Sequence, residues 1–343
     1  MSITRAAGPP TAGPTNGVER RALVIDCDPG IDDAVGLALA VASPEIDLLA
    51  VTTVAGNAPL AVTTANARGV LALLGRPDVP VFPGAARALV RQSAHNRRSP
   101  HGTNGIGGVD LPAVTAAQSG GRAVEALARL LGEARPRSIV IAALGPLTNL
   151  ALLISLYPEL TDRIDRIVVM GGSMSAGNIT PVAEFNTWFD PEAAQRVLAD
   201  SDLDVTTVGL DVTRLATVDD ELVSTLARRG DAGAALASMV TAYLDRRQTG
   251  WSLHDVLAVA TVIEPAIVTT TTATLEVVVA GPARGQTIYA LDELRHRYAT
   301  DDPDADPPDQ KVQVAIDLDI SRFRLLVADR VAAARPLERT GRP

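Results

Sequence analysis

The sequence Ala22-Leu-Val-Ile-Asp-Cys-Asp-Pro-Gly-Ile-Asp-Asp-Ala34 decides the fold and marks where the chemistry of this chain lies. A short apolar run leads into a Pro-Gly turn, after which apolar residues follow helical spacing. Four aspartates, Asp26, Asp28, Asp32 and Asp33, fall within eight residues of this junction. Carboxylates this crowded repel one another unless a counter-charge is present. The stretch therefore predicts a strand, a turn and a helix around a bound divalent cation.

The same alternation continues along the chain. Apolar runs typical of buried strands are separated by helical patterns, which favours a mostly parallel sheet covered by helices on both faces. We therefore predict an α/β fold with one domain, residues 21–331, between a disordered N-terminal tail, 1–20, and a C-terminal tail, 332–343. Two late strands are expected as antiparallel additions to the sheet. The predicted strands are 22–25, 47–54, 79–82, 138–143, 164–170, 205–208, 272–279 and 312–317, and the predicted helices are 32–42, 61–74, 120–133, 147–155 and 191–199.

The residues that follow each predicted strand indicate the ligand. In open parallel sheets, ligands bind beyond the carboxyl ends of the strands. The first strand is followed by the aspartates and the second by Gly56-Asn57, while Leu144-Gly-Pro and Gly171-Gly172 follow two later strands. These segments are acidic, polar and glycine-rich, as a pocket for a metal ion and a sugar requires.

Composition narrows the function further. The 343 residues carry a formal charge of −9, which argues against binding to nucleic acid or to an anionic membrane surface. A single cysteine, Cys27, forbids an internal disulfide, and Lys311 is the only lysine. The first 20 residues lack the apolar segment of a signal peptide, and no apolar run reaches membrane-spanning length. We expect a soluble, cytoplasmic protein.

The aspartate cluster fits three alternative roles less well. Helix capping accounts for one or two of the carboxylates but not for four at one turn. An EF-hand loop that begins at Asp26 needs glycine at its sixth position and glutamate at its twelfth, which here are Ile31 and Leu37. An aspartyl-phosphate phosphatase also places Asp-x-Asp after its first strand, but it recruits a lysine for which Lys311 has no suitable setting. A metal-dependent phosphatase stays open as an alternative.

Asp26-Cys-Asp-Pro-Gly-Ile-Asp-Asp-Ala34 resembles the signature of the nucleoside hydrolases of the inosine–uridine-preferring type. Further motifs follow in that family's order, and the resemblance spans about residues 21–331. It implies a Rossmann-like fold and hydrolysis of the N-glycosidic bond of ribonucleosides to free base and ribose. The matching motifs are Thr53-Val-Ala-Gly-Asn57, His101-Gly102, Leu144-Gly-Pro-Leu-Thr-Asn149, Met170-Gly-Gly172, Gly177-Asn-Ile-Thr-Pro-Val-Ala-Glu-Phe-Asn186, Asp190-Pro-Glu-Ala-Ala194 and His254-Asp255.

The resemblance also implies a metal centre. The cation would be Ca²⁺, which prefers oxygen ligands, and the ligands would be Asp28, Asp33, Asp255 and the main-chain carbonyl of Leu144. Asp28 would also be the general base that takes a proton from the metal-bound water.

The substrate would be held by residues from several of these motifs. Asp32 is expected on the ribose 2′-hydroxyl, and His254 is the candidate acid that protonates the leaving base. The segment before His254 matches the family poorly, so the preference for purine or pyrimidine stays open. A homodimer or homotetramer is implied by the resemblance alone, and a non-catalytic ribose-binding protein on the same scaffold is the alternative from another class. The further expected substrate-binding residues are Asn57, His101, Met170, Asn178, Glu184, Phe185 and Asn186.

Overall fold

The computed structural model describes residues 20–91, 100–112, 114, 120–244, 251–291 and 311–331. Apart from Arg20, the two predicted tails lie outside the described residues. Within the described ranges, no helix is long and apolar enough to cross a membrane.

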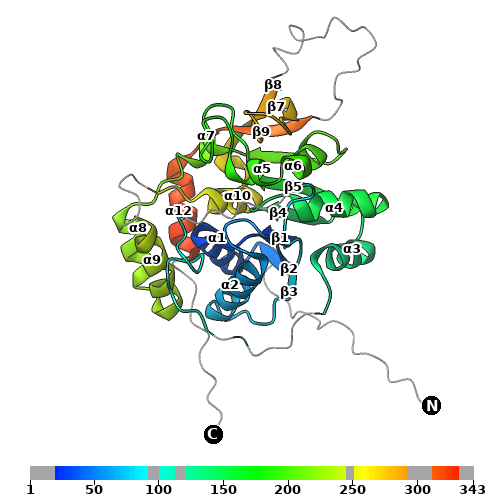
Figure 1. Ribbon diagram of the computed structural model, residues 1–343. Coiled ribbons are helices and arrows are strands. Elements are labelled where there is room, and N and C mark those ends of the chain that lie inside the picture. The colour runs from blue at the N-terminus through cyan, green and yellow to red at the C-terminus, as the bar shows by residue number, and fades with distance from the viewer. Residues whose placement is uncertain are drawn as a thin grey trace, which may run out of the picture.

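One mixed sheet forms the centre of the molecule (Figure 1). In the described part of the chain it has nine strands in the order β3-β2-β1-β4-β5-β6-β9-β7-β8. The strands from β3 to β9 in this order are parallel neighbours, whereas β7 runs antiparallel to both β9 and β8. The strands are β1 (Arg21–Cys27), β2 (Ile46–Thr53), β3 (Val81–Pro83), β4 (Ile139–Ala143), β5 (Ile164–Met170), β6 (Val205–Val208), β7 (Val268–Val277), β8 (Thr287–Leu291) and β9 (Val312–Leu318).

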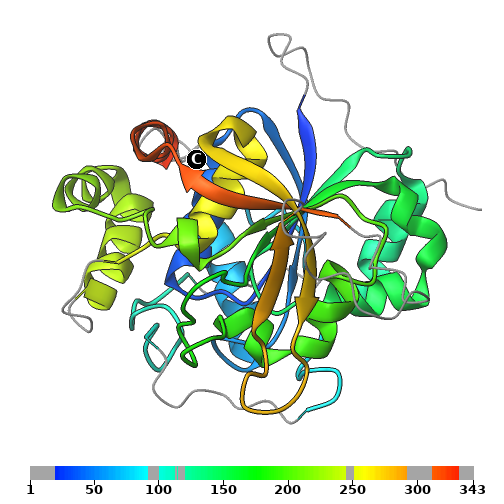
Figure 2. The same ribbon diagram turned by 90° about the horizontal axis from the view of Figure 1, so that it is seen from above.

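Helices cover both faces of this sheet (Figure 2). Successive residues of a strand point to opposite faces, so Leu23 and Ile25 of β1 join one buried apolar cluster and Val24 joins the other. The first cluster includes α1 (Ile31–Ala42), α2 (Leu60–Leu73), α8 (Asp220–Ala227), α9 (Gly230–Leu244), α10 (His254–Ile263) and α12 (Ile320–Val331), and the second includes α3 (Ala123–Glu133), α4 (Thr148–Leu156) and α6 (Pro191–Leu198).

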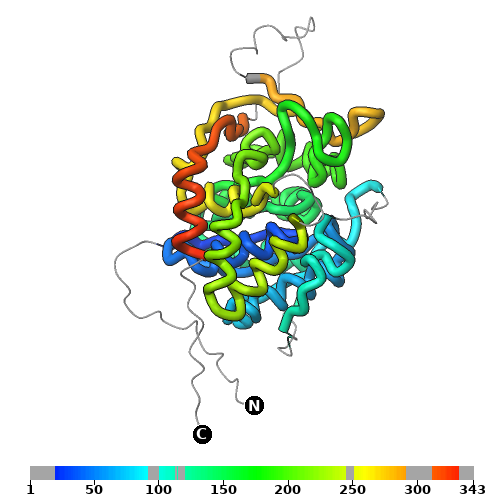
Figure 3. The backbone as a smooth tube through the Cα atoms, turned by 90° about the vertical axis from the view of Figure 1, so that its left-hand side faces the viewer, coloured from blue at the N-terminus to red at the C-terminus, as the bar shows by residue number. Residues whose placement is uncertain are grey.

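Smaller elements complete the fold. Helices α8 and α9 form a hairpin beside α12 (Figure 3). Short helices α5 (Phe185–Phe189) and α7 (Leu210–Thr213) follow β5 and β6, and two 3₁₀ turns span Pro158–Arg163 and Pro265–Ile267.

The predicted α/β fold with a mostly parallel sheet is confirmed, and the strands 164–170 and 205–208 match residue for residue. Two details were wrong. Strand β8 was not predicted, because Thr287–Leu291 is short and has no clear apolar alternation. The strand predicted at 312–317 pairs with β6 in parallel, although β7 is antiparallel as expected. Hydrophobic alternation carries no information on strand direction, which explains the second error.

Strand register brings distant segments together at one edge of the sheet. Asp26 of β1 is paired with Ala143 of β4, which is paired with Val169 of β5. The turns after these strands are therefore neighbours, as the rule for open parallel sheets requires.

Candidate active site

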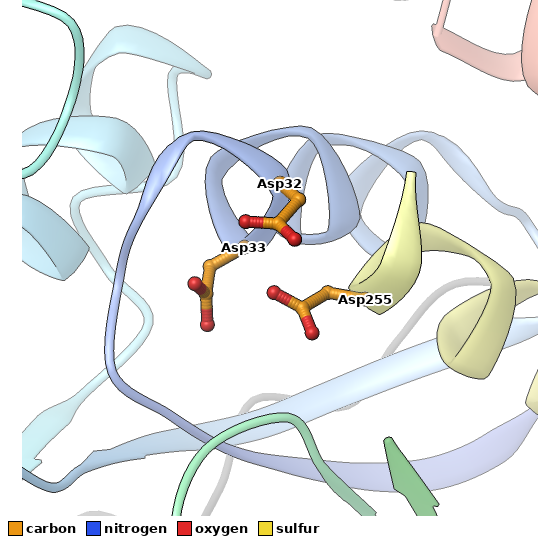
Figure 4. Close-up of side chains that lie close together, drawn as sticks. All are labelled: Asp32, Asp33 and Asp255. Carbon is orange, nitrogen blue, oxygen red and sulfur yellow. The ribbon is translucent and has the colours of Figure 1, made fainter. Parts of the chain in front are cut away.

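Three carboxylates converge where two helices begin. Asp32 and Asp33 lie in the first turn of α1, and Asp255 lies in the first turn of α10. One carboxylate oxygen of each lies within 4.8 Å of the others, and all three side chains are buried. The carboxylates point toward one another between the two helices (Figure 4). The positive ends of both helix dipoles favour negative charge here, but dipoles alone do not offset three buried carboxylates.

Asp28 lies in the turn between β1 and α1, next to this group but not one of its three members. Its Oδ2 accepts a hydrogen bond of 2.5 Å from the backbone N–H of Asn57. Two glycines enclose the carboxylate. A Cβ at Gly56 would overlap Asp28 Oδ2, and one at Gly145 would lie 2.6 Å from Oδ1. Asp28 therefore sits in a fixed backbone cradle built from the turns after β2 and β4.

Burial makes the charged forms of these groups unfavourable. Burial raises the pKa of Asp32 to about 6, and burial together with the charge of Asp32 raises the pKa of Asp33 to about 6. Burial raises the pKa of Asp28 and of Asp255 well above the usual range, and the neighbouring carboxylates add to both shifts. A bound cation would reverse this penalty.

The donor set fits a hard divalent cation. The buried oxygens Asp32 Oδ1 and Asp33 Oδ1 have no hydrogen-bond partner in the described structure. Carboxylate and carbonyl oxygens are the ligands that Ca²⁺ and Mg²⁺ prefer. The carbonyl of Leu144 accepts a hydrogen bond of 2.8 Å from Asn186 Nδ2, which leaves a second lone pair for another partner.

The fourth aspartate of the cluster has a structural task. Asp26 is fully buried, and its Oδ1 accepts hydrogen bonds from Thr52 Oγ1 at 2.5 Å and Asn149 Nδ2 at 2.7 Å. Asn149 also donates to the Thr53 carbonyl and accepts from the N–H of Ala85. Asp26 thus ties the ends of β1 and β2 to the start of α4, as expected for a residue that supports the turn.

A cavity of about 600 Å³ opens above the acidic group. Every predicted substrate-binding residue lines it, and so do Leu144, His254 and Asp255. Asp28 and Asp33 do not line the cavity and are almost completely inaccessible to solvent. The predicted site residues are thus gathered in one place, with Asp28 and Asp33 at the deepest level. The predicted substrate-binding residues in the lining are Asp32, Asn57, His101, Met170, Asn178, Glu184, Phe185 and Asn186.

One wall of the cavity is the segment around α5. The Glu184 carboxylate caps this helix by accepting hydrogen bonds from the N–H groups of Asn186 and Thr187 at 2.8 and 3.1 Å. Burial raises the pKa of Glu184 to about 7. Asn186 Nδ2 donates to the carbonyls of Leu144 and of Met170, at 2.8 and 3.1 Å. This wall is therefore joined by side-chain hydrogen bonds to the ends of β4 and β5.

The two predicted histidines stand in different settings. His101 Nδ1 accepts a hydrogen bond of 3.1 Å from the backbone N–H of Ile31, and it lies 3.8 Å from Asp32 Oδ1. That bond requires an unprotonated Nδ1. His254 begins α10, and its Nδ1 is 2.7 Å from Thr213 Oγ1 at the end of α7. Both rings are thus oriented by neighbouring elements at the cavity wall.

Comparison with known proteins identifies the family. The family model described as inosine-uridine preferring nucleoside hydrolase matches residues 23–324. The chain belongs to this family. It is 37% identical over 330 residues to an inosine-uridine preferring nucleoside hydrolase of Leishmania major, an alignment that covers 94% of this chain and 99% of the relative. It is 41% identical over 260 residues to a pyrimidine-specific ribonucleoside hydrolase of Salmonella paratyphi B, which covers 72% of this chain and 81% of the relative.

The fold of the chain also matches solved structures of nucleoside hydrolases. A plant nucleoside hydrolase matches with a TM-score of 0.84 and 29% identity, over 91% of this chain and 99% of that one. A purine-preferring ribonucleoside hydrolase from Gardnerella vaginalis matches with a TM-score of 0.82 and 31% identity, over 92% and 99%. As a nucleoside hydrolase, the protein is an enzyme that hydrolyses N-glycosyl bonds of small-molecule nucleosides, and its buried aspartates are suited to hold a metal ion.

This nucleoside hydrolase has cavity residues that no motif of the sequence predicted. Tyr243 of α9 lies between two other rings, with centroids 5.8 Å from His101 and 4.9 Å from Trp251. Arg214 also lines the cavity, and its side chain is positively charged. None of these positions was predicted from a motif of the sequence, except His101, and the buried face of α9 shows Tyr243 only as one apolar residue among several. The further lining residues outside the quoted motifs are Pro100, Leu210, Thr217 and Ser252.

Proposed function

We propose that the protein is a Ca²⁺-dependent ribonucleoside hydrolase in which Asp28, Asp33, Asp255 and the Leu144 carbonyl hold the cation and Asp28 is the general base. The observation that carries this proposal is a set of buried carboxylates at the floor of a cavity lined by all the expected ribose-binding residues. Two of these carboxylates have an oxygen without a hydrogen-bond partner among the described residues. When bound, a hard cation orients and acidifies a water molecule.

The residues around the floor have separate tasks in this proposal. Asp28 is held by the Asn57 N–H and by two glycines, and it accepts the proton of the attacking water. Asp32 binds the ribose 2′-hydroxyl. The 5′- and 3′-hydroxyls are bound by Asn178, Glu184 and Asn186. The acidic floor stabilises the positive charge that develops on the ribose as the bond to the base breaks.

The departing base lies toward His101, Phe185 and His254 in this proposal. His254 donates the proton that the base needs, with its ring oriented by Thr213. Relatives of this chain include a pyrimidine-specific and a purine-preferring enzyme, so we propose ribonucleosides as the substrate class without choosing between the two kinds of base.

The family resemblance also leads us to propose a homodimer or homotetramer. Light scattering after gel filtration measures this oligomeric state. Domain bounds of 21–331 and a cytoplasmic location stay predictions.

The test is release of reducing sugar from inosine, uridine and cytidine. The wild-type enzyme should lose activity in chelator and regain it with Ca²⁺, and Asp28→Ala should lower turnover by several orders of magnitude. Asp78→Ala is the matched control, because Asp78 is exposed and forms an ion pair with Arg76. Release of phosphate from a phosphomonoester would favour the phosphatase alternative, and nucleoside binding without turnover would favour the non-catalytic one. Near-normal activity of Asp28→Ala would refute the assignment of the base.

A further inference from the structure

Arg214 brings a permanent positive charge to the cavity. It follows α7 directly, and it is the only lysine or arginine in the lining formed by the described residues. Its Nη2 donates a hydrogen bond of 2.8 Å to the carbonyl of Gly177. Gly177 and the adjacent Asn178 also line the cavity, so the guanidinium end of Arg214 lies at the cavity wall.

The same stretch of wall carries His254. Thr213, the residue before Arg214, contacts His254 Nδ1, and the carbonyl of Arg214 accepts a hydrogen bond of 3.1 Å from Ser252 Oγ. The backbone N–H of Leu253 donates a hydrogen bond of 2.8 Å to the carbonyl of Ala216. Arg214 and His254 are therefore fixed to each other through a short network of backbone and side-chain contacts.

The lining of the cavity carries charges of both signs. Asp32, Glu184 and Asp255 provide the acidic lining, which suits positive charge on the ribose. The base leaves with the electron pair of the glycosidic bond, so negative charge develops on its ring. That charge spreads to any carbonyl oxygen conjugated with the departing nitrogen. A guanidinium is always charged and offers several N–H donors in a fixed plane, which suits such an oxygen.

We propose that Arg214 stabilises the departing base by donating a hydrogen bond to a ring carbonyl, and so selects bases that carry one. This inference rests on the proposed function. The C1′–N bond breaks, its electron pair goes to the base, the water oxygen bonds to C1′, and the proton of that water goes to Asp28. The base then takes a proton from His254 or solvent. Uracil and hypoxanthine have the required carbonyl, whereas adenine has none.

Leaving-group dependence separates this role from a structural one. We compare kcat/KM of the Ca²⁺-loaded wild type and Arg214→Met for uridine, 5-fluorouridine and p-nitrophenyl riboside. The substitution Arg214→Met removes one hydrogen-bond donor to the negative charge that develops on the base. It should therefore lower kcat/KM for uridine by about 10²-fold. The loss should be smaller for 5-fluorouridine, whose fluorine makes the departing base more acidic, and smallest for p-nitrophenyl riboside. Arg214→Lys keeps the charge and should recover part of the loss.

A matched control comes from Arg163. It is half-buried and donates a hydrogen bond of 2.9 Å to the Ala134 carbonyl outside the cavity, so Arg163→Met should leave all three substrates unchanged. Equal losses for the three substrates in Arg214→Met would mean that the residue only supports the Gly177 loop, and no loss would also overturn the proposal. If the wild type released no ribose from any nucleoside, the proposed function itself would fail, which is a distinct result.

Discussion

Two glycines set the position of the carboxylate of Asp28, the residue that we propose as the general base. Its carboxylate fits between Gly56 and Gly145, and a methyl group at position 56 would overlap Oδ2. We expect Gly56→Ala to displace the carboxylate, to weaken Ca²⁺ binding and to lower kcat by about 10²-fold, since misplacement by about 1 Å is this costly. Calorimetric titration with Ca²⁺ and steady-state kinetics measure both effects.

Gly132→Ala provides the control for this prediction. Gly132 lies in α3, and a Cβ there would meet nothing within 4 Å among the described residues. Unchanged metal affinity in Gly56→Ala would show that Asp28 is not held as the geometry indicates.

The proposed role of His254 as the acid that protonates the base predicts an effect that depends on the leaving group. With His254→Ala we expect a large loss for uridine and inosine, about 10²-fold or more, because their bases need a proton to depart. p-Nitrophenyl riboside needs little protonation and should be affected much less. Single-turnover rates for the three substrates provide the measurement, and equal losses would count against His254 as the acid.

Motif residues and other cavity residues differ in how well the sequence reveals them. Asn178, Glu184 and Asn186 occur in one long motif, and the structure brings all three to the cavity wall. Arg214, directly after α7, and Tyr243 of α9 reach the same wall without a motif that predicts it, because their positions follow from tertiary packing. Asp28 at the metal centre stays a prediction, and the three carboxylates with oxygens within 4.8 Å of one another are those of Asp32, Asp33 and Asp255.

At the scale of elements, the β7–β8 hairpin supports the wall that carries Phe185 and Asn186. The Gly285 carbonyl accepts a hydrogen bond of 2.8 Å from Thr187 Oγ1, and Arg284 lies 4.5 Å from the ring centre of Trp188. Because strand β8 was not predicted, the contacts between the hairpin and α5 could not be predicted either. The sequence showed the α5 motif but not the hairpin that holds it.

Gly285→Ala tests this support. Gly285 has a φ of +80°, and an added Cβ would overlap Trp188. The left-handed conformation alone costs an alanine on the order of 1 kcal/mol. We expect a larger loss of stability than this, with a severalfold rise in KM as α5 shifts, measured by thermal unfolding and by kinetics with uridine.

Gly281→Ala is the matched control in the same hairpin. Its φ is +78°, but no described atom lies within 4 Å of an added Cβ, so it carries the backbone strain without the contact. If the two variants have the same KM, the hairpin does not position α5.

At the scale of the whole molecule, the site exists only because the sheet collects distant segments. Residues 28–33 follow β1, residues 56–57 follow β2 and Leu144 follows β4, while Asp255 comes from the helix that packs against α1. The alternation of strands and helices predicted this edge from the sequence, because parallel strands end together. The parallel direction of β9 relative to β6 could not be predicted, because apolar alternation carries no information on strand direction.

The concentration of buried carboxyl groups should also govern the stability of the molecule. Burial raises the pKa of Asp26, Asp32 and Asp33 to about 6 and that of Glu184 to about 7. In the unfolded chain these groups titrate near ordinary values of about 4. The folded chain without metal therefore binds more protons than the unfolded chain between about pH 4 and 7. Its free energy of unfolding falls as pH rises through this range.

Ca²⁺ should reverse this dependence. Protons and the cation compete for the same carboxylates, so the stabilisation by Ca²⁺ grows as pH rises. We expect the midpoint of thermal unfolding in chelator to fall by several degrees from pH 5 to pH 8, and the increase produced by saturating Ca²⁺ to be larger at pH 8 than at pH 5. Asp78, whose pKa is lowered by Arg76, is ionised in both the folded and the unfolded chain from pH 5 to pH 8 and does not add to this difference. Differential scanning calorimetry at the two pH values, with and without Ca²⁺, measures all four midpoints. An equal increase at both pH values would show that the cation does not bind at the buried carboxylates.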